Sequence, residues 1–277
     1  MKNIYKQTIG ITGASGTLGK YFIKKFKNFF IFKKYPGRIE SISNLKKWLI
    51  QNTDIKIFLH FAAIASTIKA EKNKKRTFLI NSQIPIKIIK FLNDNKIIKL
   101  DYFLFASTSH VYKPSYSPVS EKSIRKPVNV YGLSKKKVEN FIIKNQKKIK
   151  IKIGIARIFN FSHSSQKKGF FITDIKEKII KSKNKIYLKN INTFRDFINI
   201  SCLCKIIKFM IDKKITGPLN IGSGLAINLV DLVFRLIKKN KKELFFSYDI
   251  KKKPGLIADI RKLKKNGYTN RIQTLNL

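Results

Sequence analysis

Short apolar runs alternate with longer segments of helical periodicity over the first 160 residues of the chain. The runs cover Thr8–Thr12, Lys56–Leu59, Tyr102–Ala106 and Lys150–Ala156, and a further run is expected near Phe29–Lys33. Such alternation is typical of βαβ units, in which a helix joins two parallel strands. The pattern therefore predicts an α/β fold with a doubly wound parallel sheet of the Rossmann type.

The alternation ends near residue 160, and this change divides the chain. Residues 1–160 are expected to form a dinucleotide-binding Rossmann domain. Residues 161–277 break into shorter pieces, with helices expected near Cys202–Lys213 and Leu229–Lys239. These pieces are expected to form a small C-terminal α/β region. Apolar residues make up 43% of the chain, which is enough for a core at this length.

The first predicted strand runs into a glycine-rich loop, Gly13-Ala14-Ser15-Gly16-Thr17-Leu18-Gly19. Gly13 allows a sharp turn, Gly16 allows the backbone to approach a pyrophosphate, and Gly19 allows the next helix to pack on the sheet. The free N–H groups and the dipole of that helix would then favour phosphate groups. The spacing G-x-x-G-x-x-G departs from G-x-G-x-x-G, so the loop alone also fits an ordinary strand-to-helix turn.

Basic residues follow the second predicted strand, where NAD-binding proteins place an Asp or Glu for the ribose 2′-hydroxyl. Lys33, Lys34 and Arg38 occupy this stretch. A carboxylate would repel the 2′-phosphate of NADP, whereas cations attract it. The sequence therefore favours NADP(H) over NAD(H), although lysine is abundant throughout the chain.

A tyrosine and a lysine stand four residues apart in Tyr131-Gly132-Leu133-Ser134-Lys135. On a helix the two side chains would share a face. Free tyrosine titrates near pH ~10, and a nearby ammonium is expected to lower the pKa of Tyr131. Tyr131 would then act as general acid or base at a carbonyl or alcohol oxygen, with Thr108 hydrogen-bonded to the same oxygen. The spacing alone also fits a chance pair on a solvated helix, and the glycine loop and Thr108 favour the catalytic interpretation.

The chain carries 60 Lys and Arg against 15 Asp and Glu, a net charge of +45 at pH 7. A charge of this size raises the question of a nucleic-acid or anionic membrane partner. Lys, Ile, Asn, Phe and Tyr all have A/T-rich codons, so an A/T-rich genome explains the composition without a partner. No nucleic-acid-binding motif accompanies the charge. We expect no specific nucleic-acid partner and no membrane partner, and the charge should attract anionic small molecules.

The sequence also predicts a cytoplasmic location. No apolar run approaches the ~20 residues of a membrane helix, and the first strand begins within ten residues of Met1, which leaves no room for a signal peptide. Cys202 and Cys204 have no histidine nearby, so we expect free thiols and no metal site.

In their order, these motifs resemble the extended short-chain dehydrogenase/reductases, the NAD-dependent epimerase/dehydratase family that acts on nucleotide sugars. The similarity covers nearly the whole chain. Its further markers are His60-Phe61-Ala62-Ala63, Asn81, Ser107–Tyr112, Arg157–Asn160, Arg195–Ile200, Asn220–Gly224 and Lys253-Pro254-Gly255.

The resemblance implies a role for each matching residue. Catalysis falls to Thr108, Tyr131 and Lys135. Cofactor binding falls to Gly13, Ser15, Gly16, Thr17, Leu18, Gly19, Lys34, Arg38, Phe61, Ala62, Ala63, Asn81, Tyr131 and Lys135. Substrate binding falls to Ser109, His110, Asn160, Arg195 and Lys253, with no metal ligand. It further implies that residues 161–277 bind the substrate and return in part to the main sheet, and that a homodimer is a possible assembly.

Departures from the family pattern argue against 4,6-dehydratase and decarboxylase chemistry. Members that dehydrate or decarboxylate usually carry acidic residues just after the catalytic threonine, where this chain has Ser109 and His110. We interpret His110 as a partner of substrate hydroxyls or a packed residue, ahead of a substitute base. A chain of 277 residues is short for a sugar epimerase, and the compact segment Phe29–Leu59 is similar to that of 4-keto-6-deoxysugar reductases.

We therefore expect reduction of a 4-keto-6-deoxyhexose nucleotide at C4, with Tyr131 as general acid. A nucleotide-sugar 4-epimerase with tightly bound NAD is the first alternative, because the same residues would serve it. A regulatory or scaffold protein that keeps the fold without catalysis is the second. The resemblance places the reaction in deoxysugar and polysaccharide biosynthesis.

Overall fold

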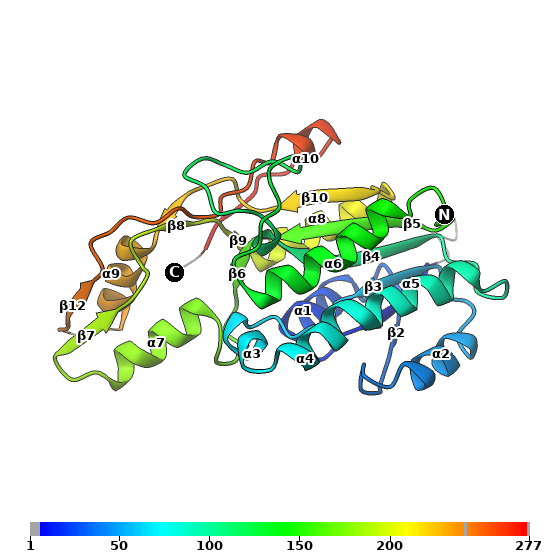
Figure 1. Ribbon diagram of the computed structural model, residues 1–277, viewed down its shortest axis with the longest axis horizontal. Helices are drawn as coiled ribbons and strands as arrows, with labels where there is room; N and C mark the ends of the chain where they lie inside the picture. Colours follow the sequence, from blue (N-terminus) through cyan, green and yellow to red (C-terminus); the bar gives the residue numbers. More distant parts are fainter. Residues whose placement is uncertain (1–5, 241–242, 276–277) are drawn as a thin grey trace.

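Six parallel strands form the central sheet in a computed structural model of the protein, which describes residues 6–240 and 243–275 (Figure 1). The strand order is β10-β5-β4-β3-β1-β2. The strands are β1 (Thr8–Thr12), β2 (Ile31–Lys34), β3 (Ile57–His60), β4 (Tyr102–Thr108), β5 (Lys152–Ile158) and β10 (Gly217–Ile221). The predicted doubly wound parallel sheet is confirmed.

Helices cover both faces of this sheet because its central strands are apolar on both sides. One face packs against α1 (Thr17–Phe26) and α8 (Ile200–Asp212). The other packs against α2 (Ile42–Ile50), α5 (Ile84–Asp94) and α6 (Val130–Lys144). The remaining helices before residue 160 are α3 (Thr67–Lys72), α4 (Lys74–Phe78), a π-helical turn (Leu79–Gln83) and a 3-10 turn (Ser109–Val111).

The predicted strands lie within two residues of the observed ones at each end. β1 has the predicted bounds, whereas β2 starts at Ile31, two residues later than expected. β4 continues two residues past Ala106 because Ser107 and Thr108 still pair with β5. This extension places Thr108 at the end of the strand, next to the start of the 3-10 turn.

Beyond residue 160 the chain builds a smaller region where the strands of the sheet end (Figure 1). It contains α7 (Phe171–Lys181) and α9 (Leu229–Lys239), whereas α10 (Arg261–Lys265) packs beside β10 on the main sheet. Three two-stranded sheets pair β6 (Asn160–Ser162) with β9 (Phe197–Asn199), β7 (Lys185–Leu188) with β12 (Phe245–Tyr248), and β8 (Phe194–Arg195) with β11 (Ile227–Asn228). The chain returns to the main sheet through α8 and β10.

One buried carboxylate joins three segments of this region. Asp196 accepts hydrogen bonds from the backbone N of Ser223 at 2.7 Å, Gly224 at 2.9 Å and Ala258 at 3.1 Å. It also accepts one from the Ser223 hydroxyl at 2.7 Å. A Cβ on Gly222 would lie 2.5 Å from the same carboxylate. Asp196 therefore fixes the position of the chain next to Arg195.

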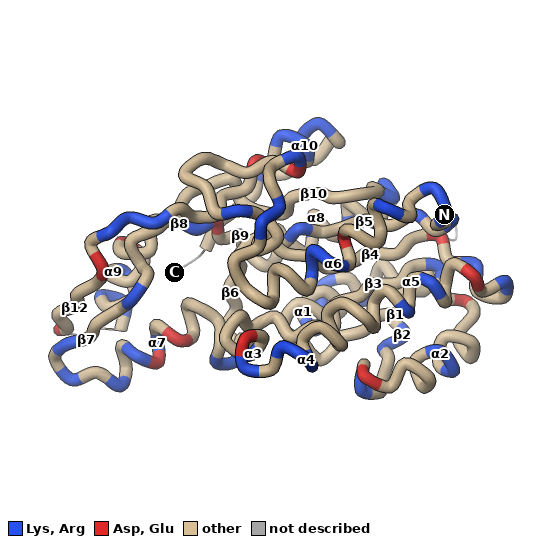
Figure 2. The backbone as a smooth tube through the Cα atoms, viewed as in Figure 1, with Lys and Arg blue, Asp and Glu red and all other residues tan. Residues whose placement is uncertain are grey.

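Lysines and arginines are distributed over the whole molecule and do not gather on one face (Figure 2). In the part of the chain that the structure describes, no helix has the length and hydropathy needed to cross a bilayer. Within residues 6–240 and 243–275, no cluster of His, Cys, Asp or Glu is arranged to hold a metal ion.

Candidate active site

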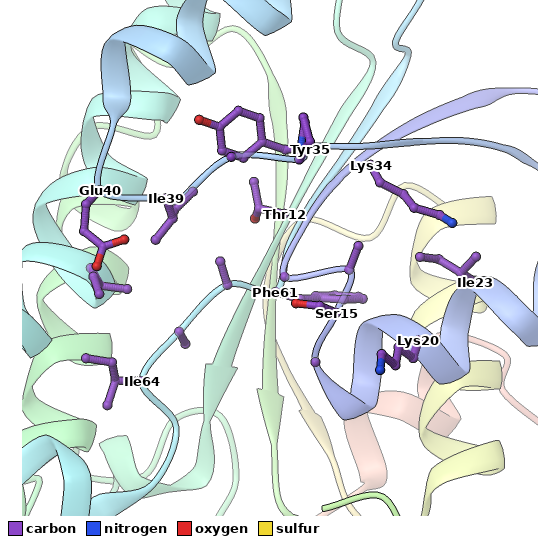
Figure 3. A pocket seen from close by; sticks show the side chains of 18 of the residues that line it. Thr12, Ser15, Lys20, Ile23, Lys34, Tyr35, Ile39, Glu40, Phe61 and Ile64 are labelled. Atoms are coloured by element: carbon purple, nitrogen blue, oxygen red, sulfur yellow. The ribbon is translucent and has the colours of Figure 1, made fainter. Parts of the chain in front are cut away.

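A cleft of about 810 Å³ lies at the carboxyl ends of β1, β2 and β3 (Figure 3). Its floor is the glycine loop. Gly13 has φ +73°, and a Cβ there would lie 2.5 Å from the backbone N of Ala62. A Cβ on Gly19 would lie 2.4 Å from the carbonyl oxygen of Gly13. Both positions therefore require glycine for the fold itself.

Gly16 differs from these two glycines. Its Cβ would meet only the Gly13 oxygen, at 3.3 Å, and Gly16 lines the cleft. Gly16 is also the N-cap of α1, which has no side-chain cap and no acidic residue in its first turn. The first N–H groups of α1 thus lack a side-chain acceptor. This arrangement fits the pyrophosphate of a dinucleotide.

The charged side chains that line the cleft are mostly basic. They are Lys20, Lys24, Lys34, Arg76 and Glu40. Figure 3 shows Lys20 and Lys34 on the α1 side and Glu40 on the opposite side. Arg76 pairs with Glu40 at 2.6 Å and holds the pKa of that carboxyl below its usual range. The cleft therefore presents a net positive charge.

The structure brings together many, but not all, of the residues expected to bind a cofactor. Those that line the cleft are Gly13, Ser15, Gly16, Lys34, Phe61, Ala62 and Ala63. Thr17, Leu18, Gly19 and Arg38 lie outside that lining. Asn81 also lies outside the lining and is 0% exposed. Its amide bonds both the N and the O of Ile64 and the Ser134 hydroxyl, so it holds the loop that lines the cleft.

A second group of polar residues lies where β4 ends, next to β3 in the sheet. Three successive β4 residues contact three residues one turn apart on α6. Lys135 Nζ donates to the Ala106 oxygen at 2.8 Å, and the Ser107 hydroxyl donates to Glu139 at 2.5 Å. The Thr108 side chain lies close enough to the Tyr131 hydroxyl to affect its pKa. The expected trio Thr108, Tyr131 and Lys135 therefore lies together.

Two residues at the start of α6 make this contact possible. A Cβ on Gly132 would lie 2.1 Å from the carbonyl oxygen of His110, so glycine lets the helix approach the end of β4. Asn129 is the N-cap, and its Oδ1 accepts from the backbone N of Gly132 at 2.8 Å. The ring of His110 meets the ring of Tyr131 edge to face, with centroids 5.8 Å apart.

The pKa of Tyr131 differs from the expectation. Burial raises the pKa of Tyr131 to about 12, and the neighbouring Thr108 side chain opposes that rise. The prediction that this pKa is lowered was wrong, because the burial of Tyr131 is the largest influence and disfavours the phenolate. Burial lowers the pKa of Lys135 to about 7, against the pull of Glu139. Tyr131 is thus a neutral phenol at neutral pH.

A buried ion pair holds the same helix against β5. Arg157 donates to Glu139 at 2.6 Å, and both side chains are almost fully buried, at 1% and 0% exposure. Arg157 also donates to the hydroxyl of Tyr112 at 2.7 Å, which donates in turn to Asn220 on β10 at 2.6 Å. This network connects α6 to β5, to Tyr112 just after the 3-10 turn, and to β10.

The residues expected to bind substrate follow different patterns. The guanidinium of Arg195 forms no ion pair or hydrogen bond with any described residue, and it lies 4.8 Å from the ring centre of Phe171. Burial lowers its pKa. The Asn160 amide donates to the backbone carbonyl oxygen of Asp196 at 3.0 Å. The Lys253 ammonium donates to the side-chain oxygen of Asn190. Ser109 follows Thr108 and is 2% exposed, much like Thr108 and Lys135.

Sequence reasoning missed several residues of the site. Glu139 and Lys20 could have been found by helical spacing, since they lie four residues after Lys135 and Gly16. Asn129 carries an N-cap signal, an asparagine just before a helix. Glu40 and Arg76 are 36 residues apart, and no local signal connects them.

This combination of glycine cleft and Thr-Tyr-Lys cluster is typical of Rossmann-fold enzymes that use a nicotinamide cofactor. The chain belongs to the NAD dependent epimerase/dehydratase family, whose model matches residues 9–222. The predicted family and enzyme class, NAD(P)-dependent reductases and epimerases of nucleotide sugars, are thereby confirmed.

Individual relatives cover nearly the whole chain. GDP-6-deoxy-D-talose 4-dehydrogenase of Aggregatibacter actinomycetemcomitans is 26% identical over 267 residues, 91% of this chain and 88% of the relative. dTDP-4-dehydro-6-deoxyglucose reductase of Escherichia coli is 26% identical over 290 residues, 93% of this chain and 90% of the relative. Among solved structures, RMD of Pseudomonas aeruginosa complexed with NADPH has a TM-score of 0.81 and 20% identity, covering 94% of this chain and 92% of that chain. Matched structures hold NADPH, NADP or NAD.

Proposed function

We propose that the protein reduces the C4 carbonyl of a 4-keto-6-deoxyhexose nucleotide with NADPH. The observation that carries this proposal is the placement of Tyr131 and Lys135, one turn apart on α6, against the end of β4 that carries Thr108. A phenol that keeps its proton at neutral pH is suited to donate it to a carbonyl being reduced. The two relatives named above, a 4-dehydrogenase and a 4-dehydro-6-deoxysugar reductase, support the same substrate class.

Each catalytic side chain then has a defined task. When bound, the reduced cofactor supplies the hydride that C4 accepts. The Thr108 hydroxyl orients the carbonyl oxygen, and the Tyr131 hydroxyl gives that oxygen its proton as the C=O double bond becomes an alcohol. The phenolate left on Tyr131 has a pKa raised by burial, so it recovers a proton from water. Lys135 shares the face of α6 with Tyr131 and would hold the nicotinamide ribose.

The charges of the cleft support NADPH as the cofactor. Lys20, Lys24 and Lys34 have no acidic neighbour in the lining except Glu40, and Arg76 neutralises Glu40. A 2′-phosphate would therefore meet cations and no free carboxylate. Lys34→Glu is expected to weaken NADPH binding and to leave NADH binding nearly unchanged, as measured by titration of each cofactor. Equal changes for both cofactors would contradict this preference.

An anionic substrate fits the other side of the site. Arg195 is a half-buried cation with no carboxylate partner among the described residues, and an anion would complete it. We assign the diphosphate of the nucleotide sugar to Arg195, with Asn160 and Lys253 as further contacts. His110 lies close enough to Arg195 for the guanidinium charge to affect its pKa, which supports a diphosphate site on the same side as Tyr131.

The direct test is the absorbance of NADPH after addition of a panel of 4-keto-6-deoxy nucleotide sugars. Sugar-dependent, stoichiometric oxidation is expected. Tyr131→Phe should lower the rate by at least about 100-fold, because the proton donor is removed. Tyr268→Phe is the control, since Tyr268 packs on Phe209 of α8, on the other face of the sheet from α6.

Other outcomes separate the alternatives. If no sugar oxidises NADPH but the purified protein retains cofactor and interconverts C4 epimers, the chain is a 4-epimerase. If it neither binds cofactor nor turns over a sugar, the enzymatic proposal fails and a regulatory or scaffold role takes its place.

A further inference from the structure

The amide of Asn129 has only one orientation that satisfies its neighbours. Its Oδ1 accepts from the backbone N of Gly132 at 2.8 Å, a bond that an amide NH₂ cannot replace. The amide Nδ2 therefore faces the ring of His110, at 3.0 Å from Nδ1. Because Nδ2 can only donate, His110 Nδ1 must accept.

This bond decides where His110 carries its proton. A neutral imidazole has one N–H and one lone pair, so a ring that accepts at Nδ1 carries its proton on Nε2. Nε2 forms no hydrogen bond with any residue that the structure describes, and it is not among the fully buried unpaired atoms. The groups that face the ring are the N-cap Asn129, Tyr131 on α6 and the charge of Arg195 on β8, while Thr108 on β4 accepts from the backbone N of His110. Burial and the Arg195 charge lower the pKa of His110 to about 4, so the ring is neutral at neutral pH.

We propose that His110 donates a hydrogen bond from Nε2 to a sugar oxygen beside the one that Tyr131 protonates, and that Asn129 is the positioning residue that fixes this donor. The inference deepens the proposed function and rests on it. It also assigns His110 a role other than that of a base, because the ring presents a proton and not a lone pair. Removal of a proton from a sugar carbon therefore has no acceptor at this residue.

Two substitutions at Asn129 separate the donor role from helix capping. In Asn129→Asp one carboxylate oxygen still caps α6, while the other can only accept, so His110 moves its proton to Nδ1. In Asn129→Ser the hydroxyl still caps the helix, and no second polar atom remains for His110. Both residues are good N-caps, so both variants should fold.

The first readout is the nitrogen-15 spectrum of protein labelled in histidine. The chain has three histidines, and His110→Gln identifies the signal of interest. We expect the wild type to show an unprotonated Nδ1 and a protonated Nε2 at neutral pH. Asn129→Asp should show the reverse tautomer, mixed with imidazolium.

The second readout is kcat/KM as a function of pH. Asn129→Asp should lose about tenfold at neutral pH, because the neutral ring now offers a lone pair at Nε2. Its carboxylate also raises the pKa of the ring, and the imidazolium carries N–H on both nitrogens. Activity of Asn129→Asp should therefore recover as the pH falls through that pKa, whereas Asn129→Ser should show no such recovery.

Two results would overturn the inference. One is a wild-type spectrum with the proton on Nδ1. The other is an Asn129→Asp variant whose kcat/KM has the same size and pH dependence as that of Asn129→Ser. Failure of the proposed function looks different, since the wild type itself would then oxidise no NADPH with any sugar. In that case the donor role falls with it, whatever the tautomer.

Discussion

The cofactor side and the substrate side of the site are built in different ways. The cofactor cleft consists of three short loops at the ends of neighbouring strands, and backbone geometry at Gly13 and Gly19 shapes it. The substrate side depends on Asp196, one buried carboxylate that collects donors from the segments around Ser223 and Ala258. The first is a local construction, and the second is an assembly of segments far apart in the chain.

Because of this difference, a substitution on one side should weaken the binding of its own ligand and leave the binding of the other ligand intact. A change in the glycine loop acts on cofactor binding and on the packing of α1. A change at Asp196 acts on Arg195 and the smaller region while the parallel sheet keeps its own two cores. Cofactor affinity and sugar-nucleotide affinity are therefore independent readouts of the two constructions.

The largest effect is expected from Asp196→Ala. Four donors lose their acceptor, and each buried unsatisfied group costs about 1–3 kcal/mol, so the free energy of unfolding should fall by at least about 4 kcal/mol. Urea unfolding measures this loss, and calorimetric titration should show sugar-nucleotide binding lost with NADPH binding retained. Asp212→Ala is the control, because Asp212 forms an exposed pair with Lys208. Parallel loss of both ligands would show that the two sides are one unit.

A smaller loss is expected from Glu139→Gln, which tests the buried ion pair between α6 and β5. Glu139 neutralises the buried Arg157 and bonds Ser107 beside the catalytic threonine. Breaking a buried pair by removing one charge costs about 3 kcal/mol or more. A double-mutant cycle with Arg157→Met should show strong coupling in urea unfolding. If the two single losses simply add, the pair does not act as a unit.

Local patterns explain why the cofactor side could be predicted from the sequence. The glycine loop, β1 and the Tyr131–Lys135 pair each depend on residues close together in the chain. The contacts of Asp196 could not be predicted, because they join positions 27 and 62 residues apart. The direction of the pKa shift at Tyr131 could not be predicted from the sequence either, because it depends on how deeply α6 packs against β4.

Acid should weaken the fold through a group on the cofactor side. His60 ends β3, is 0% exposed, and its Nδ1 lies 3.0 Å from the Thr12 hydroxyl. Burial lowers its pKa from 6.5 to about 3. Between about pH 6.5 and pH 3, His60 is protonated in the unfolded chain and neutral in the folded chain. The free energy of unfolding therefore decreases as the pH is lowered from about 6.5 to about 3. Asp196 has the opposite sign, because burial raises its pKa.

From pH 7 to pH 5, His60 alone should cost about 2 kcal/mol. Urea unfolding over this pH range measures the slope, and His60→Leu should reduce it by nearly one proton. Phe103→Leu is the matched control, since Phe103 stacks on His60 but does not titrate. A slope that is the same in wild type and His60→Leu would contradict the assignment.

The smallest effect on the fold is expected from Gly16→Ala, which makes it the cleanest probe of the cofactor side. The new Cβ would meet only the Gly13 oxygen, at 3.3 Å, and would otherwise project toward the cleft. The free energy of unfolding should fall by less than about 1 kcal/mol, the usual difference between N-cap residues. The Kd for NADPH should rise about tenfold, or ~1.4 kcal/mol, because the methyl group occupies the approach to the pyrophosphate.

Gly19→Ala is the matched control. Its Cβ would lie 2.4 Å from the same Gly13 oxygen, so it should destabilise the fold and bind NADPH poorly for that reason. A Gly16→Ala protein with normal stability and normal NADPH affinity would show that the backbone at Gly16 does not approach the cofactor.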